Sequence, residues 1–221
     1  MVMREAPVER EKTREPYVFE LTGGRLCLDF ANTVSNHAGP HPREHLHSYA
    51  DLVSWGRQAG ILSEEEAQLL LQEAVRRPEE AQAVLARAIA LREAIYRIFS
   101  SIATGRPPRP DDLDLLNAAL CEALSHLCCV DFADGRFTWG WRGPQNALER
   151  ILWPVVRDAA ELLTSGELSR VRHCADDVCG WLFIDRSKNR SRRWCNMQVC
   201  GNKAKARRHY EKIRKQKHIR P

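Results

Sequence analysis

The sequence has no long apolar run and none of the usual catalytic signatures. No segment approaches the roughly 18–20 apolar residues that cross a bilayer. The first sixteen residues are charged and carry no apolar stretch of the kind found in secretory signals, so we expect a disordered leader at residues 1–16. Nothing resembles a phosphate-binding glycine loop or a nucleophile elbow. These absences predict a soluble, cytoplasmic protein that does not bind membranes and is not an enzyme.

Acidic residues are almost missing from the C-terminal end of the chain. Residues 186–221 carry fourteen lysines and arginines against a single acid, Glu211, which gives a net charge of +13. Residues 1–185 have a net charge of −8. Such an asymmetry is typical of proteins that bind a polyanion. The alternative is a solvated basic tail that only improves solubility.

Helical periodicity dominates residues 17–165, which we expect to form one domain. Apolar residues recur at helical spacing in five segments, residues 49–59, 63–77, 79–104, 111–125 and 145–164. Ser63 is a predicted N-cap, and an aspartate is expected to cap the helix at residues 111–125. Pro154 predicts a kink in the last of these helices.

Two segments of this domain look extended. Residues 17–34 are predicted to form two strands joined by a turn at Gly23-Gly24. Residues 126–143 are predicted to form a β-hairpin that turns at Asp134-Gly135. We therefore predict a mainly α (α+β) fold, in which a helical N-terminal domain carries a few antiparallel strands.

Four of the eight cysteines form two matched pairs in a small C-terminal module, residues 168–221. The spacing is Cys174-x4-Cys179, fifteen residues, then Cys195-x4-Cys200. Four thiolates suit a tetrahedral zinc ion and leave no open coordination position, so we predict one structural Zn²⁺ per chain. The alternative, two disulfides or four free thiols, is disfavoured by the paired spacing and a reducing compartment.

The segments around the two pairs predict the shape of the module. Residues 181–184 alternate as in a strand, and residues 192–194 are expected to return beside them as a second strand. Gly180 and Gly201 follow the second cysteine of each pair, where a positive φ is expected. Asn202 is the predicted N-cap of a basic helix. Knuckle, hairpin, knuckle and helix, in that order, predict a treble-clef-like or zinc-ribbon-like finger.

Basic side chains in the hairpin and the helix are the candidate nucleic-acid contacts. They are Arg190, Arg192, Arg193, Lys203, Lys205, Arg207, Arg208, Lys212, Arg214 and Lys215. Such a surface can neutralise phosphates and release counterions, and zinc-anchored helices commonly enter the major groove of DNA. The sequence therefore favours a DNA-binding transcription regulator. Structured RNA is the alternative partner, because shape and phosphate contacts dominate its recognition.

The module resembles the CGNR zinc finger family. The family signature appears here as Phe183-x-Asp185-x-Ser187-Lys188-Asn189, followed by Arg192-Arg193-Trp194-Cys195-x-Met197-x-x-Cys200-Gly201-Asn202-Lys203. The family has Arg at the position of Lys203, a difference that keeps the charge. The match spans about residues 168–215. It implies zinc ligation by the four cysteines and a zinc-ribbon-like module that contacts nucleic acid, RNA included.

The N-terminal part resembles the ABATE domain that commonly accompanies this finger. The matching residues are Gly24, Leu26, Leu28-Asp29-Phe30 and Asn32-Thr33. The two resemblances together imply a bacterial stress-induced transcription regulator. The two-part layout of the chain motivates a separate hypothesis, in which the helical domain senses a small-molecule effector or forms a homodimer and changes how the finger is presented.

Two further groups of polar residues could carry a different function. Asp29 and Asn32 lie in an apolar run and could bind a ligand, or serve an enzyme in which the finger is only structural. We expect instead that they cap a helix or hold a loop. Four histidines between His37 and His47 could bind a second metal ion, but the signal is compositional only.

Overall fold

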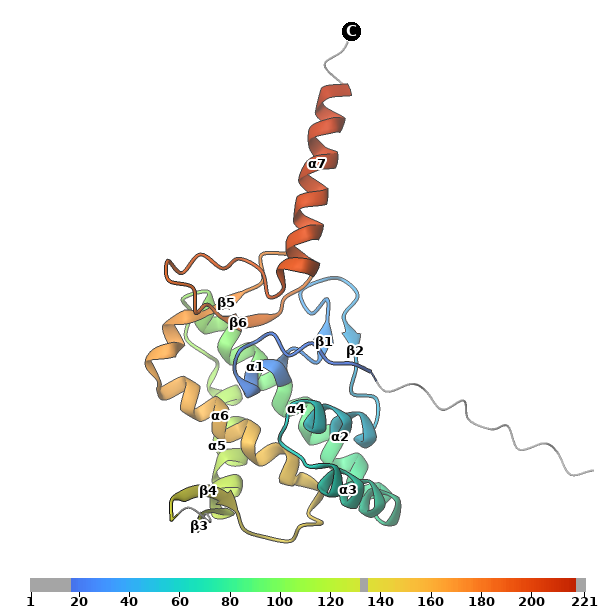
Figure 1. Cartoon of the computed structure of the whole chain (residues 1–221), viewed down its shortest axis with the longest axis vertical. Helices are drawn as coiled ribbons and strands as arrows, with labels where there is room; N and C mark the ends of the chain where they lie inside the picture. Colours follow the sequence, from blue (N-terminus) through green and yellow to red (C-terminus); the bar gives the residue numbers. More distant parts are fainter. Residues whose placement is uncertain (1–16, 132–134, 218–221) are drawn as a thin grey trace, which may run out of the picture.

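The computed structural model describes residues 17–131 and 135–217, so the expected leader and Asp134 lie outside the described residues. The described part is mainly helical, as predicted (Figure 1). Its α-helices are α1 (Leu26–Ala31), α2 (Tyr49–Gln58), α3 (Glu64–Arg76), α4 (Pro78–Ala103), α5 (Pro110–Ser125), α6 (Trp153–Thr164) and α7 (Asn202–Lys217). None of the described helices is long and apolar enough to span a membrane.

Short strands pair only with one another, as three antiparallel two-stranded sheets within the described residues. The pairs are β1 (Val34–Ser35) with β2 (Arg43–Glu44), β3 (Leu127–Asp131) with β4 (Phe137–Trp141), and β5 (Val171–His173) with β6 (Leu182–Ile184). Two 3₁₀ segments, η1 (Leu148–Leu152) and η2 (Gly166–Arg170), flank α6, and one π-helical turn, η3 (Met197–Gly201), leads into α7.

Side-chain caps fix where the first long helices begin. The Ser63 hydroxyl accepts a hydrogen bond from the Glu66 amide, and the Glu66 carboxylate accepts one from the Ser63 amide, which confirms the predicted N-cap. Ser48 and Asp51 form the same reciprocal pair at the start of α2. Each cap satisfies amide groups that the first turn of a helix leaves without partners.

The body of the protein is built around α4, which runs through its middle (Figure 1). This helix packs against α1, α2, α3 and α5. Its inward face is apolar and buried, and it shares one core with the other helices, in which Phe30 and Trp55 lie 4.9 Å apart, centroid to centroid. Regular apolar spacing along 26 residues made this helix predictable.

The prediction of two strands at residues 17–34 is wrong, because Leu26–Ala31 forms α1. Four of the six residues of this helix are buried, so the segment has no polar face to reveal its period. A residue far away in the sequence caps the start of this helix. The Asp158 carboxylate of α6 accepts a hydrogen bond of 2.8 Å from the Cys27 amide in the first turn. Gly24, with φ of +79°, does form the predicted turn.

Two of the predicted helix details also need correction. Pro154 lies in the first turn of α6, where a proline costs no hydrogen bond, so it starts a helix and does not kink one. In α5, Pro110 occupies the first turn after Arg109, and no aspartate side chain caps that helix. The hairpin at residues 126–143 is confirmed as β3 and β4, with Gly135 at φ of +71° in the turn.

Candidate metal centre and nucleic-acid interface

The four cysteines predicted to bind zinc come together at one point. All four sulfurs lie within 4.8 Å of one another, and all four residues are buried. The Sγ atoms of Cys179 and Cys195 are 3.6 Å apart, and those of Cys195 and Cys200 are 3.7 Å apart. Four sulfurs held about 2.3 Å from a tetrahedral zinc ion are about 3.8 Å apart, so the set fits that ion.

The chemistry of the thiols also fits a divalent cation. Burial, together with the negative charge of the neighbouring Cys174, raises the pKa of the Cys200 thiol. A cation ligated by this sulfur stabilises the thiolate form that burial otherwise opposes. With four protein ligands the ion has no open position for a substrate, so this single zinc site is structural.

Short side-chain hydrogen bonds shape the two zinc knuckles. The Asp176 carboxylate accepts from the Val178 amide in the first knuckle, and the Asn196 side chain accepts from the Gln198 amide in the second. Gly180 has the predicted positive φ, at +71°, but Gly201 does not, because it lies in the π-helical turn η3. Asn196 is therefore the cap before the basic helix, and the prediction for Asn202 is wrong.

The hairpin of the module differs from the prediction. β6 pairs with β5, which precedes the first knuckle, and residues 192–194 form no strand. The loop at residues 185–192 is instead held by the fully buried Asp185, whose carboxylate accepts from the amides of Ser187 and Arg192. The buried Asp185 thus holds residues 185–192 in place without a second strand. The alternation of apolar residues in the sequence does not reveal this arrangement.

The strand β6 separates two apolar clusters. Leu182 and Ile184 point into the core of the helical body, whereas Trp181 and Phe183 pack with the four cysteines. Successive side chains of a strand point to opposite faces, so one strand serves both clusters. Because Val171 of β5 also belongs to the body core, the hairpin is part of the body as much as of the finger.

Four hydrogen bonds join this hairpin region to the N-terminal part of the chain. The buried Asn32 side-chain amide donates to the carbonyl of Leu182 and accepts from its amide, both at 2.9 Å. The Trp181 indole donates to the Val34 carbonyl, and the Ile184 amide donates to the carbonyl of Gly23. A backbone bond also reaches a zinc ligand, from the His37 amide to the Cys179 carbonyl.

The basic residues predicted to contact nucleic acid fall into two groups. Arg192 is used internally: its guanidinium donates to the carbonyls of Ile184, Thr22 and Cys195 and lies 4.3 Å from the centroid of the Phe183 ring. The other predicted residues with described side chains are exposed, namely Arg190, Arg193, Lys203, Lys205, Arg207, Arg208 and Arg214. Lys212 and Lys215 lie on α7, but their side chains are outside the described ones.

The helix α7 carries most of this exposed charge and projects away from the rest of the molecule (Figure 1). Every side chain from Lys205 to Tyr210 is exposed. One ion pair ties the helix to the first knuckle, between Arg207 and Asp177 at 2.7 Å, with both side chains largely in solvent. Such an exposed pair is weak, so Arg207 remains available to another anion.

Asp29 and Asn32 do not form an open site. Asn32 is sealed against Leu182, and the Asp29 carboxylate accepts a 2.7 Å hydrogen bond from the Gly23 amide, which holds the turn before α1. Burial raises the pKa of Asp29 to about 6. No histidine is among the described contacts of Asp29. Both Asp29 and Asn32 form hydrogen bonds with backbone groups of neighbouring segments, as predicted.

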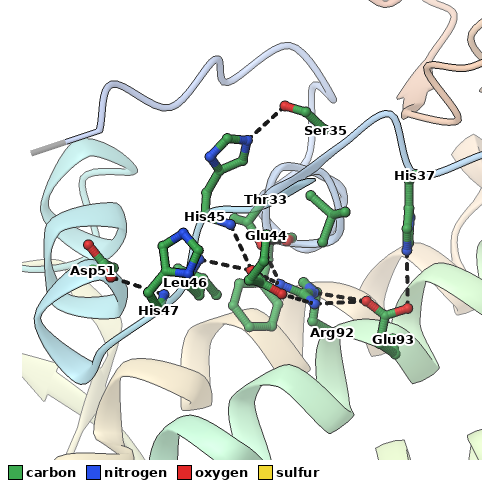
Figure 2. A network of polar contacts seen from close by, with 12 residues as sticks. Thr33, Ser35, His37, Glu44, His45, Leu46, His47, Asp51, Arg92 and Glu93 are labelled. Atoms are coloured by element: carbon green, nitrogen blue, oxygen red, sulfur yellow. Dashed lines mark hydrogen bonds and ion pairs between the residues drawn. The ribbon is translucent and has the colours of Figure 1, made fainter. Parts of the chain in front are cut away.

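The histidine stretch does not bring three potential metal ligands together. Among the described residues, only the four cysteines bring three or more potential metal ligands together. His37 instead pairs with Glu93 on α4, and His45 contacts the Ser35 hydroxyl (Figure 2).

A buried arginine lies beside these histidines and was missed from the sequence. Arg92 forms a two-pronged ion pair with Glu44 at 2.6 and 2.7 Å, and also contacts Glu93 (Figure 2). The Glu44 carboxylate accepts from the amides of His45 and Leu46, so this cluster fixes the loop after β2 to α4. An arginine on the buried face of an apolar helix is the one signal that could have indicated it.

These features define the class of the protein as a helical domain joined to a four-cysteine zinc finger. The chain belongs to the ABATE family, since the family model described as "putative stress-induced transcription regulator" matches residues 24–166. The model of the CGNR zinc finger matches residues 170–212. A search of curated proteins gives no match to this chain.

Proposed function

We propose that this zinc-binding regulator acts by binding duplex DNA through α7, and that it is not an enzyme. The observation that supports the proposal most strongly is the isolation of α7. Its sixteen residues span about 24 Å at 1.5 Å per residue, and every described side chain from Lys205 to Tyr210 is exposed. A basic helix of this kind adds no side chains to the core, which favours a role for its charge in binding a partner over a role in folding.

The shape of this helix favours DNA over RNA. The major groove of B-DNA is about 12 Å wide and admits an α-helix, whereas the major groove of A-form RNA is deep and narrow. A helix that stands clear of the body over most of its length can enter the wider groove without a collision. Arg190 and Arg193 are exposed in the segment between the two zinc knuckles and offer further positive charge for phosphate contacts.

The zinc site supports this role by holding the base of the helix. Cys200 lies in the turn η3, directly before α7, so metal binding fixes the direction in which the helix leaves the finger. An enzymatic role finds no support in the described residues, because the zinc site is closed and Asp29 and Asn32 hold backbone. A cytoplasmic location stays a prediction.

The test is a salt titration of binding to duplex DNA and to structured RNA, with the zinc-loaded full chain. Replacing Arg207 and Arg208 with Ala should weaken DNA binding at least tenfold and reduce the slope of log affinity against log salt by about 1–2, because two phosphate contacts are lost. The matched control replaces Arg136 and Arg142, two exposed arginines of the body that form no ion pair with any described side chain.

The control protein should bind DNA as tightly as the parent chain. Equal losses in both double variants would show that net charge alone matters and that α7 is not the contact surface. Tighter binding to RNA than to DNA at every salt concentration would contradict the proposal and would indicate that the partner of the protein is RNA.

A further inference from the structure

A groove on the helical body lies between α4, α5 and α6, and neither family description accounts for it. Its volume is about 240 Å³. The floor is apolar and consists of the buried side chains of Leu91, Leu152, Trp153 and Val156. Pockets between the helices of a bundle are common places for small ligands.

Small side chains keep this groove open. Ala90 on α4 and the neighbouring Ala118 and Ala119 on α5 line it, and none of the three can reach across to the facing helix. Leu115 flanks them and is 40% exposed. Apolar surface is thus left in contact with water, which is unfavourable by about 25 cal/mol for each Å². A bound apolar group would remove this cost.

Three charged residues surround the groove and lack partners. Arg87 on α4, Glu122 on α5 and Glu149 on η1 line it, yet none of these described side chains forms an ion pair or a hydrogen bond. Other arginines of the body are paired, as Arg97 is with Asp112 and Arg150 with Glu66. Charges of opposite sign therefore border one groove without meeting across it.

We propose that this groove binds a small zwitterion with an apolar body, of the size of an aromatic or branched amino acid. The carboxylate would pair with Arg87, the ammonium group would lie between Glu122 and Glu149, and the apolar part would cover Trp153. A cavity of about 150 Å³ accommodates benzene. The groove is larger, at about 240 Å³, and so has room for a ring and a charged head group.

The signs of the three charges favour a ligand that carries both charges over one that carries a single charge. A plain carboxylic acid would place its anion near two glutamates, and a plain amine would leave Arg87 unpaired beside a cation. A molecule with both charges places an opposite charge beside Arg87 and beside the two glutamates, and one negative charge of the pair of glutamates then remains. This inference does not depend on the role of α7, but it gives the regulator a candidate effector class.

The experiment measures binding of L-phenylalanine, L-leucine, 3-phenylpropionate and phenethylamine to the zinc-loaded full chain by calorimetry. We expect one of the two amino acids to bind at least tenfold more tightly than either single-charge analogue. Arg87→Gln should reduce its affinity to the level of the amine. The matched control is Arg106→Gln, which removes an exposed arginine outside the groove and should leave affinity unchanged.

A second variant tests the position of the site. Ala118→Leu fills the groove from an exposed helix position that tolerates leucine, so the protein should fold normally while binding falls at least tenfold. The proposal is overturned if no amino acid shows saturable binding, if a single-charge analogue binds more tightly, or if Ala118→Leu, with an unchanged circular dichroism spectrum, retains full affinity.

Discussion

The hairpin β5–β6 and the helix α7 both adjoin the single zinc site, but the hairpin is largely buried and the helix is exposed. The hairpin contributes Val171, Leu182 and Ile184 to the core of the helical body. The helix packs mainly against the turn η3 that precedes it, and an exposed ion pair joins its Arg207 to Asp177. One half of the finger therefore packs into the core of the body, while the described side chains of the other half are largely exposed.

The largest expected effect follows from removal of the metal. Cys195→Ala should abolish zinc binding and lower the free energy of unfolding by at least about 4 kcal/mol, because β6 belongs to both apolar clusters. Thermal unfolding with elemental analysis measures both effects. Cys121→Ala, at an exposed cysteine on α5, is the control and should change neither. Loss of zinc with an unchanged melting temperature would mean that the finger folds independently of the body.

A smaller effect is expected when the hairpin is detached from the body without touching the metal. Asn32→Ala leaves the amide and carbonyl of Leu182 buried without partners, which should cost about 3 kcal/mol. The zinc content should stay at one ion per chain. Urea unfolding provides the measurement, with Asn117→Ala on the exposed face of α5 as the control. A loss below about 0.5 kcal/mol, the range of ordinary surface changes, would contradict the shared core.

Asp29, which holds the turn at Gly23, should make the stability of the protein depend on pH. The pKa of Asp29 is raised to about 6 in the folded chain, above its ordinary value of 3.8, mainly by burial. The folded state therefore binds the proton more tightly, and this contribution to stability is lost as pH rises from about 4 to about 6. Asp29→Asn keeps an oxygen for the Gly23 amide and removes the charge.

This variant should be more stable than the parent chain at pH 7, by on the order of 2 kcal/mol, and equally stable near pH 3. Urea midpoints measured at both pH values provide the check. A parallel shift at both would show that the ionisation of Asp29 plays no part.

The smallest effect concerns the free helix. Ala206→Gly should weaken α7 by about 1 kcal/mol, which corresponds to roughly fivefold weaker DNA binding if the helix must be ordered in the complex. The melting temperature of the body should not change, because Ala206 is exposed and α7 projects away from the body (Figure 1). Fluorescence anisotropy with labelled duplex DNA measures the affinity. A lower melting temperature would show that α7 also packs against the body.

The parts of the structure that follow local rules were predictable from the sequence. The cysteine spacing located the zinc site, and the apolar period with the cap at Ser63 located α3 and α4. The sequence did not reveal that residues 26–31 form a helix, because an apolar run has no period to distinguish helix from strand. It also misplaced the partner of β6, since β5 lies before the first knuckle and Asp185 holds the loop where a strand was expected. The role of Asn32 depends on Leu182, 150 residues away, and no local pattern encodes such a contact.

Amide hydrogen exchange of the zinc-loaded chain, with and without duplex DNA, tests the central comparison most directly. We expect the amides of β6 to exchange only through global unfolding in both samples. The amides of α7 should exchange rapidly in the free protein and become protected at least tenfold when DNA is bound. Protection of α7 without DNA, or DNA-dependent protection of the body in place of α7, would contradict this account.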